Sequence, residues 1–579
     1  MPSINIYERD LTSPYSVDTT PNVVYIPGYA NIGPIDTPVL CNTLSEFYSI
    51  FGSKPYKFRK AQDYPTVEIT NSDKTKKTYK FTGTAKPVSS MYQKDDFEKS
   101  FILAAELLSK NLPILYERVT SGEIEKASYT DSNWGTFTAK DIYSGRVSTL
   151  ISVMIKLVND DEKHYQLTVK LAASNELGIS EKVEDFDFVL DETKANSSKI
   201  YYKYITSDII DIDWPKDGVK GTPSGFTEAK TLVLPSGADY YKTTDEFKVT
   251  DIYKAFIESC EVENSKLYNL MDKGEYQIKF LTLGAYPSFE FGLAEKKDNT
   301  EIIETYNVFV NLIETAAKRG DCIALVDHTN KSTRTLQTTA GSVYSSLSAY
   351  VKNSLTITRK GGDSEDGYTY GAMFTPYATY RLSTQNNEQY ILPASFGYLS
   401  AFAASTQTNP NWYAVAGVSR GIPSGLMGLS QNITNAIADL YQPRNNVAIN
   451  CITNIKPYGY TIWGNRTLKN NSADGDLKAL SFLNIRVLTC DLKKTLYQAC
   501  KRYTFENNTD IMWLNFKSQI EPALAKMLSG NGIASYQIIK VATTKKATIE
   551  AIIRLVPIEP VEDWFITIEL TDGVEANIQ

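Results

Sequence analysis

The stretch that decides the fold of the last third of the chain runs Asn450-Cys-Ile-Thr-Asn-Ile455, then Gly459-Tyr-Thr-Ile-Trp-Gly-Asn-Arg466-Thr-Leu468. Its apolar residues predict strands, and a helix-like run follows from Asn484 to Tyr503. A second helix is expected from near Asp510 to Gly530, and strand patterns over 535–541, 547–556 and 564–570 close the chain. None of these segments carries a catalytic pattern. They indicate a structural scaffold with one strand at each end of the chain that has no evident partner, which favours an assembly role over catalysis.

Length and composition bound the protein class. A chain of 579 residues with 42% hydrophobic content predicts three to four folded domains with an ample core. The net charge of −7, without a long Lys/Arg run, argues against nucleic acid as a partner. The 38 tyrosines are typical of wet protein interfaces or simply of β-rich structure.

Compartment and membrane expectations follow from the cysteines and the apolar runs. The six cysteines form no C-x-x-C pair, so we expect buried free thiols in a reducing compartment such as a bacterial cytoplasm. No signal peptide is recognised at the first residues, and no apolar run reaches the length of a membrane span. We therefore expect no direct membrane insertion.

The first 119 residues predict one short isolated strand and then an α/β unit. Ile4, Asn5, Ile6 and Tyr7 form a strand with its two isoleucines on one face. The polar connector after it leaves no local partner, so this strand must pair with something distant. Strands are expected at 23–26, 38–40 and 113–119, and helices at 44–51, after a Thr43–Glu46 capping box, and at 97–108.

The middle of the chain predicts an inserted β-rich region and then a return to α/β structure. Residues 56–96 and 120–250 are polar and strand-rich, with strands expected at 147–158, 165–172, 186–190 and 199–205. A strand at 277–283, a helix marked by apolar residues from Ile302 to Ala317, and a buried strand at 322–327 indicate a partly parallel sheet. Pro522 is expected to kink or divide the second C-terminal helix.

Enzyme motifs are missing from the sequence. Gly28 and Gly33 have the spacing of a phosphate loop, but Pro34-Ile35 follows where Lys-Ser/Thr is required. The acidic stretch 361–367 lacks the spacing of an EF-hand and is expected to be a solvated loop. There are two histidines and no G-x-S-x-G or H-E-x-x-H pattern, so we expect no enzyme activity, no cofactor and no metal.

Several pieces resemble one family in the right order. The opening Pro27-Gly28, Gly33-Pro34 and Pro38-Val39 resembles that of contractile phage tail sheath proteins. Further matching pieces are Ala324–Asp327, Phe374–Tyr377, Leu392–Gly397, Ile449–Ile452, Trp463–Leu468, Asn484–Arg486, Phe505–Asn508 and Trp513. The resemblance covers about 1–55, 97–119 and 275–579.

The resemblance implies a virion structural protein that polymerises as stacked homohexameric rings around an inner tail tube. Its contraction drives the tube through the host envelope for genome ejection, and its other partners are baseplate and tail terminator proteins. The particle is assembled in the host bacterial cytoplasm and the protein ends up in the virion tail. The implied fold is a mixed α+β and α/β multidomain core with flanking helices, inserted β-rich outer domains and strand arms at both ends.

Specific residues are expected to carry this role by β-augmentation, in which a strand joins a neighbour's sheet. The donated strands are Ile4–Tyr7 and a C-terminal strand of Trp564, Phe565, Ile566, Thr567, Ile568 and Leu570. The acceptor strand carries Ile549, Ala551, Ile553 and Leu555. A basic stripe beside the apolar face of the 484–503 helix is the candidate contact with an acidic tube: Arg486, Lys493, Lys494 and Lys501.

The expected division places linker arms at 1–20 and 561–579 and an α/β middle domain at 21–119 and 251–395, with 56–96 as a small insertion. An outer β-rich domain covers 120–250 and a tube-proximal domain covers 396–560. Three other functions stay open: the sheath of a tailocin or extracellular injection system, a Tyr-rich receptor-binding or adhesion protein, and a glycan-active enzyme.

Overall fold

A computed structural model describes residues 21–562 apart from 57–59, 63–65, 71–75, 82–93, 120–125, 160, 220–229, 234–245, 249–259, 264, 286–289, 298–299, 328–354, 359–363, 435–437, 439–440, 443–446, 470–476 and 544–546. The predicted terminal strands at 4–7 and 564–570 lie outside the described residues.

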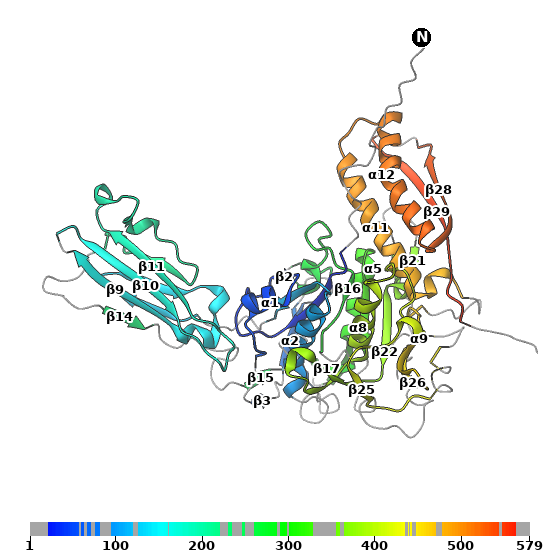
Figure 1. The fold of residues 1–579 in the computed structure, drawn as a ribbon, viewed down its shortest axis with the longest axis horizontal. Coiled ribbons are helices and arrows are strands. Elements are labelled where there is room, and N and C mark those ends of the chain that lie inside the picture. The colour runs from blue at the N-terminus through cyan, green and yellow to red at the C-terminus, as the bar shows by residue number, and fades with distance from the viewer. Residues whose placement is uncertain are drawn as a thin grey trace, which may run out of the picture.

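One eight-stranded sheet forms the centre of the molecule (Figure 1). Its order is β2 (Pro38–Cys41), β6 (Ile114–Arg118), β1 (Val24–Gly28), β16 (Phe280–Leu281), β19 (Ile323–Asp327), β22 (Gly371–Thr375), β26 (Asn450–Ile455) and β27 (Gly459–Trp463). The six inner strands run parallel, and the two edge strands pair antiparallel. The predicted partly parallel sheet is therefore confirmed.

Helices cover this sheet, and most of its inner strands are buried along their whole length. Strands β1, β6, β19 and β22 show no exposed residue, as expected for parallel strands covered on both faces. Helix α2 contacts β1 and β6, α8 contacts β19 and β22, and α5 and α11 both contact β19. The α-helices among the described residues are α1 (Leu44–Phe51), α2 (Lys94–Ser109), α4 (Lys266–Asn269), α5 (Val308–Arg319), α8 (Ala394–Thr406), α9 (Gly417–Arg420), α11 (Leu483–Tyr503) and α12 (Asp510–Ser529).

The predicted start of α1 is confirmed with one difference. The Thr43 hydroxyl accepts a hydrogen bond from the Glu46 N–H at 3.1 Å, as an N-cap does. The Glu46 carboxylate accepts from the N–H of Asn42, at 2.8 Å, and so caps the residue before the one expected.

A separate β-rich unit lies to one side of the large sheet (Figure 1). Its own core includes Trp134, Tyr165 and Phe188, with Ile32 reaching in from the first unit. The predicted strand at 199–205 is wrong beyond its start, because Tyr202–Tyr204 form a 3-10 turn. The β-rich unit contains two sheets. The five-stranded sheet has the order β12 (Ile200–Tyr201), β11 (Lys182–Val189), β10 (His164–Leu171), β9 (Ile151–Asn159) and β14 (Lys230–Val233). The three-stranded sheet has the order β13 (Ile210–Asp213), β8 (Gly135–Ala139) and β7 (Ser128–Asp131).

The predicted helix over 302–317 is wrong in its first third. Residues Thr300–Asn307 form strand β18, which pairs antiparallel with β17 (Glu290–Lys297), and the helix begins only at Val308. Threonine, isoleucine and tyrosine favour a strand when a partner is present, and the helical spacing of the apolar residues hid this. The pair continues into β5 (Lys76–Phe81) and β4 (Thr66–Thr70), and β3 (Lys60–Gln62) pairs with β15 (Glu246–Lys248).

Two smaller expectations also need correction. The acidic stretch expected to be a loop contains β21 (Ser364–Asp366), paired with β20 (Thr356–Thr358). Helix α12 runs through Pro522 without being divided. Pro522 and Ser518 are both exposed, so the carbonyl that loses its N–H partner at Ser518 can bind water instead.

The predicted domain boundary at 395/396 cuts through a single core. Helix α8 and strand β26 pack with β19 and β22 in the same hydrophobic cluster as β1. A three-stranded sheet of β24 (Gln389–Leu392), β23 (Ala378–Arg381) and β25 (Leu426–Leu429) also spans that position. A third, smaller core comprises Trp412, the middle of α11, α12 and the hairpin of β28 (Ile533–Val541) and β29 (Glu550–Pro557).

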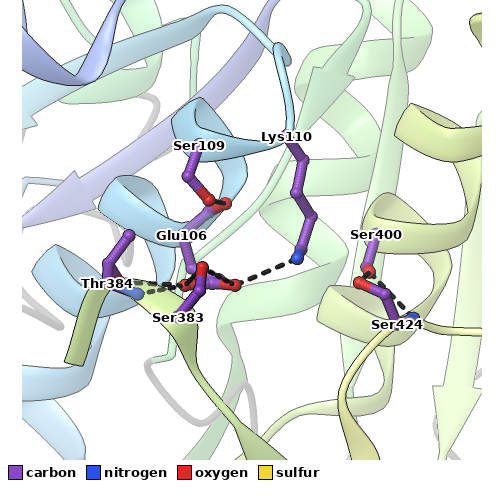
Figure 2. A network of polar contacts seen from close by, with 7 residues as sticks. All are labelled: Glu106, Ser109, Lys110, Ser383, Thr384, Ser400 and Ser424. Atoms are coloured by element: carbon purple, nitrogen blue, oxygen red, sulfur yellow. Dashed lines mark hydrogen bonds and ion pairs between the residues drawn. The ribbon is translucent and has the colours of Figure 1, made fainter. Parts of the chain in front are cut away.

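A buried carboxylate ties α2 to the rest of the large unit (Figure 2). Glu106 on α2 accepts hydrogen bonds from Lys110 Nζ at 2.9 Å and from the N–H and hydroxyl of Thr384 at 3.0 and 2.9 Å. The Ser383 hydroxyl adds a further hydrogen bond. Burial opposes ionisation, but these donors together hold the pKa of Glu106 below its usual value. A carboxylate satisfied in this way positions α2 and is not available for acid–base chemistry.

Candidate assembly surface

The β28–β29 hairpin packs on α12 through one face only. Tyr536 and Ile538 of β28 and Ile553 and Leu555 of β29 point to the same side and contact the third core. That core contains Trp412, Leu488, Leu492, Leu524 and Met527. The predicted apolar face of the 484–503 helix is confirmed, because Leu488, Leu492 and Leu496 meet this cluster and Ala499 is buried.

Within the described residues, no strand covers the outer face or either outer edge of the hairpin. Ile552 is 45% exposed and Val556 is 55% exposed, and Ile552 pairs across the strands with Ile539. Among the residues that the structure describes, neither β28 nor β29 pairs with a third strand. Unpaired edges of this kind are templates for strand addition, and a two-stranded sheet gains stability from further strands.

The predicted acceptor residues fall on this hairpin. Ile553 and Leu555 lie half-buried on the inner face, while Ala551 and Ile549 lie on its exposed end. The donor residues themselves, Ile4–Tyr7 and Trp564–Leu570, lie outside the described residues.

The predicted basic stripe on α11 is wrong for two of its four residues. Arg486 is 1% exposed, with its guanidinium 3.9 Å from the centre of the Tyr370 ring and a hydrogen bond to the Thr369 hydroxyl. Lys494 is also buried, and its Nζ has no hydrogen-bond acceptor among the described residues. Helix α11 contacts β19 of the large sheet, and the Tyr370 ring and the Thr369 hydroxyl compensate part of the buried Arg486 charge, while its Nε has no hydrogen-bond partner among the described residues.

Lys493 and Lys501 lie closer to the surface. Lys493 is half-buried and donates to the Tyr370 hydroxyl at 2.6 Å, and Lys501 is exposed. A pocket of about 570 Å³ adjoins this part of α11. Its charged lining residues are Lys273, Arg319, Lys493 and Lys494 against Asp321 and Glu365, so positive charge predominates.

An apolar tip that was not predicted from the sequence lies between α11 and α12. Phe505 is fully exposed and has a left-handed backbone (φ 76°), and Ile511 and Leu514 are 72% and 60% exposed. A positive backbone φ is rare for residues other than glycine, and such residues are often found at functional sites. The exposed Phe505 is therefore a candidate contact residue. The motif that begins at Phe505 was recognised, but periodicity could not reveal its exposure.

Two of the recognised motifs meet in space. Asp327 at the end of β19 accepts a hydrogen bond from the Ser395 N–H at 2.9 Å and another from the Ser395 hydroxyl, at the start of α8. Burial outweighs these hydrogen bonds and raises the pKa of Asp327 to about 7. The contact joins the motif pieces 324–327 and 392–397 into one structural unit.

The structure supplies no metal or membrane feature in its described part. No group of three His, Cys, Asp or Glu side chains there is placed to hold a metal ion. Within the same residues, no helix combines the length and the apolar character needed to cross a bilayer. All six cysteines are free, and five are buried, as expected; Cys500 is exposed.

Comparison with known proteins confirms the resemblance stated from the motifs. No family model matches the chain. A tail sheath protein of Vibrio phage KVP40 is 25% identical over 161 residues, which are 28% of this chain and 23% of that protein. The chain thus matches less than a quarter of the length of this relative. The chain is similar to contractile tail sheath proteins.

Three solved structures of sheath proteins have low structural similarity scores with this chain. A sheath tail protein of Listeria innocua has a TM-score of 0.48 at 11% identity, over 93% of this chain and 95% of that chain. One from Desulfitobacterium hafniense has a TM-score of 0.44 at 10% identity, over 96% and 100%. The contracted sheath complex of an extracellular contractile injection system has a TM-score of 0.34 at 19% identity, over 44% and 65%.

Proposed function

We propose that this chain is the sheath subunit of a contractile tail, a structural protein that polymerises around an inner tube. One observation carries the proposal: the β28–β29 hairpin is packed on one face and open at both outer edges within the described residues. The sequence predicts one short strand at each end of the chain, which is the number of strands that two open edges can accept. Each subunit would donate both strands to neighbours and receive two in return.

The energetics favour such an arrangement. A backbone hydrogen bond contributes about 1 kcal/mol net, so two donated strands with about five bonds each would supply roughly 10 kcal/mol before ordering costs. The exposed Ile552 and Val556 give the added strands apolar neighbours on the outer face. Head-to-tail exchange does not close on itself, so the contacts propagate into a polymer. We propose stacked hexameric rings as the form of that polymer.

Contraction in this proposal needs no fuel. The linkers stay paired while the folded bodies rotate from a metastable extended state into a contracted state that buries more surface between subunits. The movement drives the tube through the host envelope. The proposed further partners are the baseplate and the tail terminator proteins.

The tube contact is proposed at the outer half of α11. Lys501, Lys493 and the mainly cationic pocket beside them would receive acidic side chains of the tube protein. Exposed ion pairs are weak, at about 0–1 kcal/mol each, so such a contact could be released during contraction. Arg486 and Lys494 would support this surface from inside and would not touch the tube.

The same surfaces would serve in a phage-derived particle without a head. The phage relative favours a virus tail. Neighbouring capsid and terminase genes would support a phage, and their absence would support an injection particle.

Cysteine cross-linking between two differently marked copies tests strand donation directly. In a Cys500→Ser background, one copy carries Arg554→Cys on β29 and the other carries a single cysteine at one of positions 564–568. Neighbouring strands place same-face side chains within disulfide reach, so we expect cross-links at every second donor position. A copy with Asp213→Cys in the outer unit is the matched control and should give none.

Two results would contradict the proposal. One is cross-linking without a two-residue period. The other is a chain with both cysteines that forms only an intramolecular disulfide, because the strand would then pair within its own chain.

A further inference from the structure

Arg466 lies at the point where the C-terminal segment leaves the folded body. It is 4% exposed and belongs to the stretch that follows β27. Its Nε donates to Glu562 Oε1 at 3.0 Å, and its Nη2 donates to Glu562 Oε2. A two-bond contact between guanidinium and carboxylate is among the strongest charge-assisted contacts in proteins, and it fixes direction as well as distance.

The arginine is itself rigidly held. The Asn450 side chain accepts from the Arg466 N–H at 2.8 Å and donates to the Arg466 carbonyl at 2.9 Å. The guanidinium also lies 5.0 Å from the centre of the Phe482 ring, at the start of α11. Asn450 is the first residue of β26 and is fully buried. Arg466 is therefore part of the large-sheet unit and cannot follow the C-terminal segment if that segment moves.

The chain between the hairpin and this contact is short. The last backbone hydrogen bond to the hairpin runs from the Ile558 N–H to the Gly532 carbonyl at 3.1 Å. Only four residues later, Glu562 reaches the large-sheet unit. The arm predicted at 561–579 is thus held at its second residue, Glu562, so we expect free movement only beyond that residue.

We infer that Arg466 and Glu562 form a latch that sets where the C-terminal arm begins and in which direction it leaves. The latch ties the arm to the large sheet, not only to the hairpin from which the chain has just emerged. Glu562 has a 30% exposed side chain, so it can be released without unfolding the core. Arg466 and Glu562 are positioning residues, and their role as part of an arm rests on the proposed function.

A spin label at the base of the arm tests the latch in the unassembled chain. The label is attached to Asp563→Cys in the Cys500→Ser background, where the other cysteines are buried. We expect a slow-motion spectrum with Glu562 present and a clearly faster one with Glu562→Gln or Arg466→Lys, since neither variant can keep two charge-assisted bonds. Glu559→Gln removes a nearby exposed carboxylate that has no contact in the described part of the chain, and should leave the spectrum unchanged.

The melting temperature separates a released arm from a damaged core. If Glu562→Gln leaves the melting temperature nearly unchanged and frees the label, the latch is supported. If the label is equally mobile in all variants, or Glu559→Gln frees it to the same extent, the inference is wrong. The spin-label measurement does not require a polymer. If the label becomes mobile only in Glu562→Gln and Arg466→Lys but the natural chain forms no tubes, the latch is supported and the sheath function is refuted. If the natural chain forms tubes but these variants leave the label mobility unchanged, the sheath function is supported and the latch is refuted.

Discussion

At the scale of single residues, two buried carboxylates respond to pH in opposite directions. Asp327 has a pKa raised to about 7 by burial, and Glu106 has a pKa held below its usual value by the donors around it. Both residues are almost fully buried and both join distant parts of the chain. The charge of the donors accounts for the difference: Glu106 accepts from the ammonium group of Lys110, whereas the serine hydroxyl and backbone N–H groups that bond to Asp327 are neutral.

Asp327→Asn should flatten the pH dependence of stability between about pH 4 and pH 7. The unfolded pKa of Asp is about 3.9, so across this range the folded state binds a proton that the unfolded state has lost. The contribution of Asp327 to the free energy of unfolding is therefore fully present below about pH 4. It is lost as the pH rises through 7, by up to about 1.4 kcal/mol per pH unit. Melting temperatures across this range measure it, with the exposed Asp213→Asn as control. An unchanged slope in Asp327→Asn would contradict the assignment.

Glu106→Gln should destabilise the protein most at neutral pH. A carboxylate with a lowered pKa contributes stability above the unfolded pKa of about 4.3 and loses that contribution as the pH falls below it. Removing one partner of a buried charged network costs about 3 kcal/mol. Denaturant unfolding at pH 7 and pH 4 should show a large difference from the natural chain at pH 7 and a smaller one at pH 4. Equal differences at both pH values would argue against an ionised Glu106.

At the scale of elements, helix α11 shows what periodicity can and cannot predict. The apolar positions Leu488, Leu492 and Leu496 were predicted and confirmed, because burial of such side chains follows from spacing alone. The burial of Arg486 and Lys494 was not predicted, because it depends on partners more than 100 residues away in sequence, such as the Tyr370 ring. Similarly, the 300–307 strand was predicted as helix because its partner β17, and not its own spacing, decides its conformation.

A buried ion pair joins α11 to the chain just before β16. Lys279 Nζ lies 2.7 Å from Asp491 Oδ2, and both side chains are buried. Burial outweighs the attraction of Asp491 and lowers the pKa of Lys279 to about 8. This contact could not be predicted from local sequence patterns, since the two residues lie 212 positions apart.

Lys279→Met should cost about 3–5 kcal/mol of unfolding free energy, because it leaves the Asp491 charge buried without its cation. The double variant Lys279→Met/Asp491→Leu should recover most of that loss, since it leaves no uncompensated charge. Urea unfolding of the two single variants and the double variant forms a thermodynamic cycle. Additive losses in the double variant would show that the pair does not act as a unit.

At the scale of the whole molecule, the described part of the chain combines three hydrophobic cores with a hairpin whose outer edges have no strand partner there. The large sheet, the β-rich unit and the helix–hairpin unit each have their own buried cluster. The sequence predicted the strand-rich insertion and the α/β core, because composition and periodicity change at their borders. The boundary at 395/396 was misplaced, since β26 and β27 return to a sheet begun more than 400 residues earlier.

Negative-stain electron microscopy of the full chain beside a version without residues 1–20 and 561–579 shows whether strand donation builds the polymer. We expect tubes from the full chain and only monomers or small oligomers from the truncated one, because the hairpin edges would receive no donated strands. Tubes from both versions would support the sheath function but show that the terminal arms are not the linkers between subunits. Compact monomers from both, even with tube and baseplate proteins supplied, would contradict the sheath function itself.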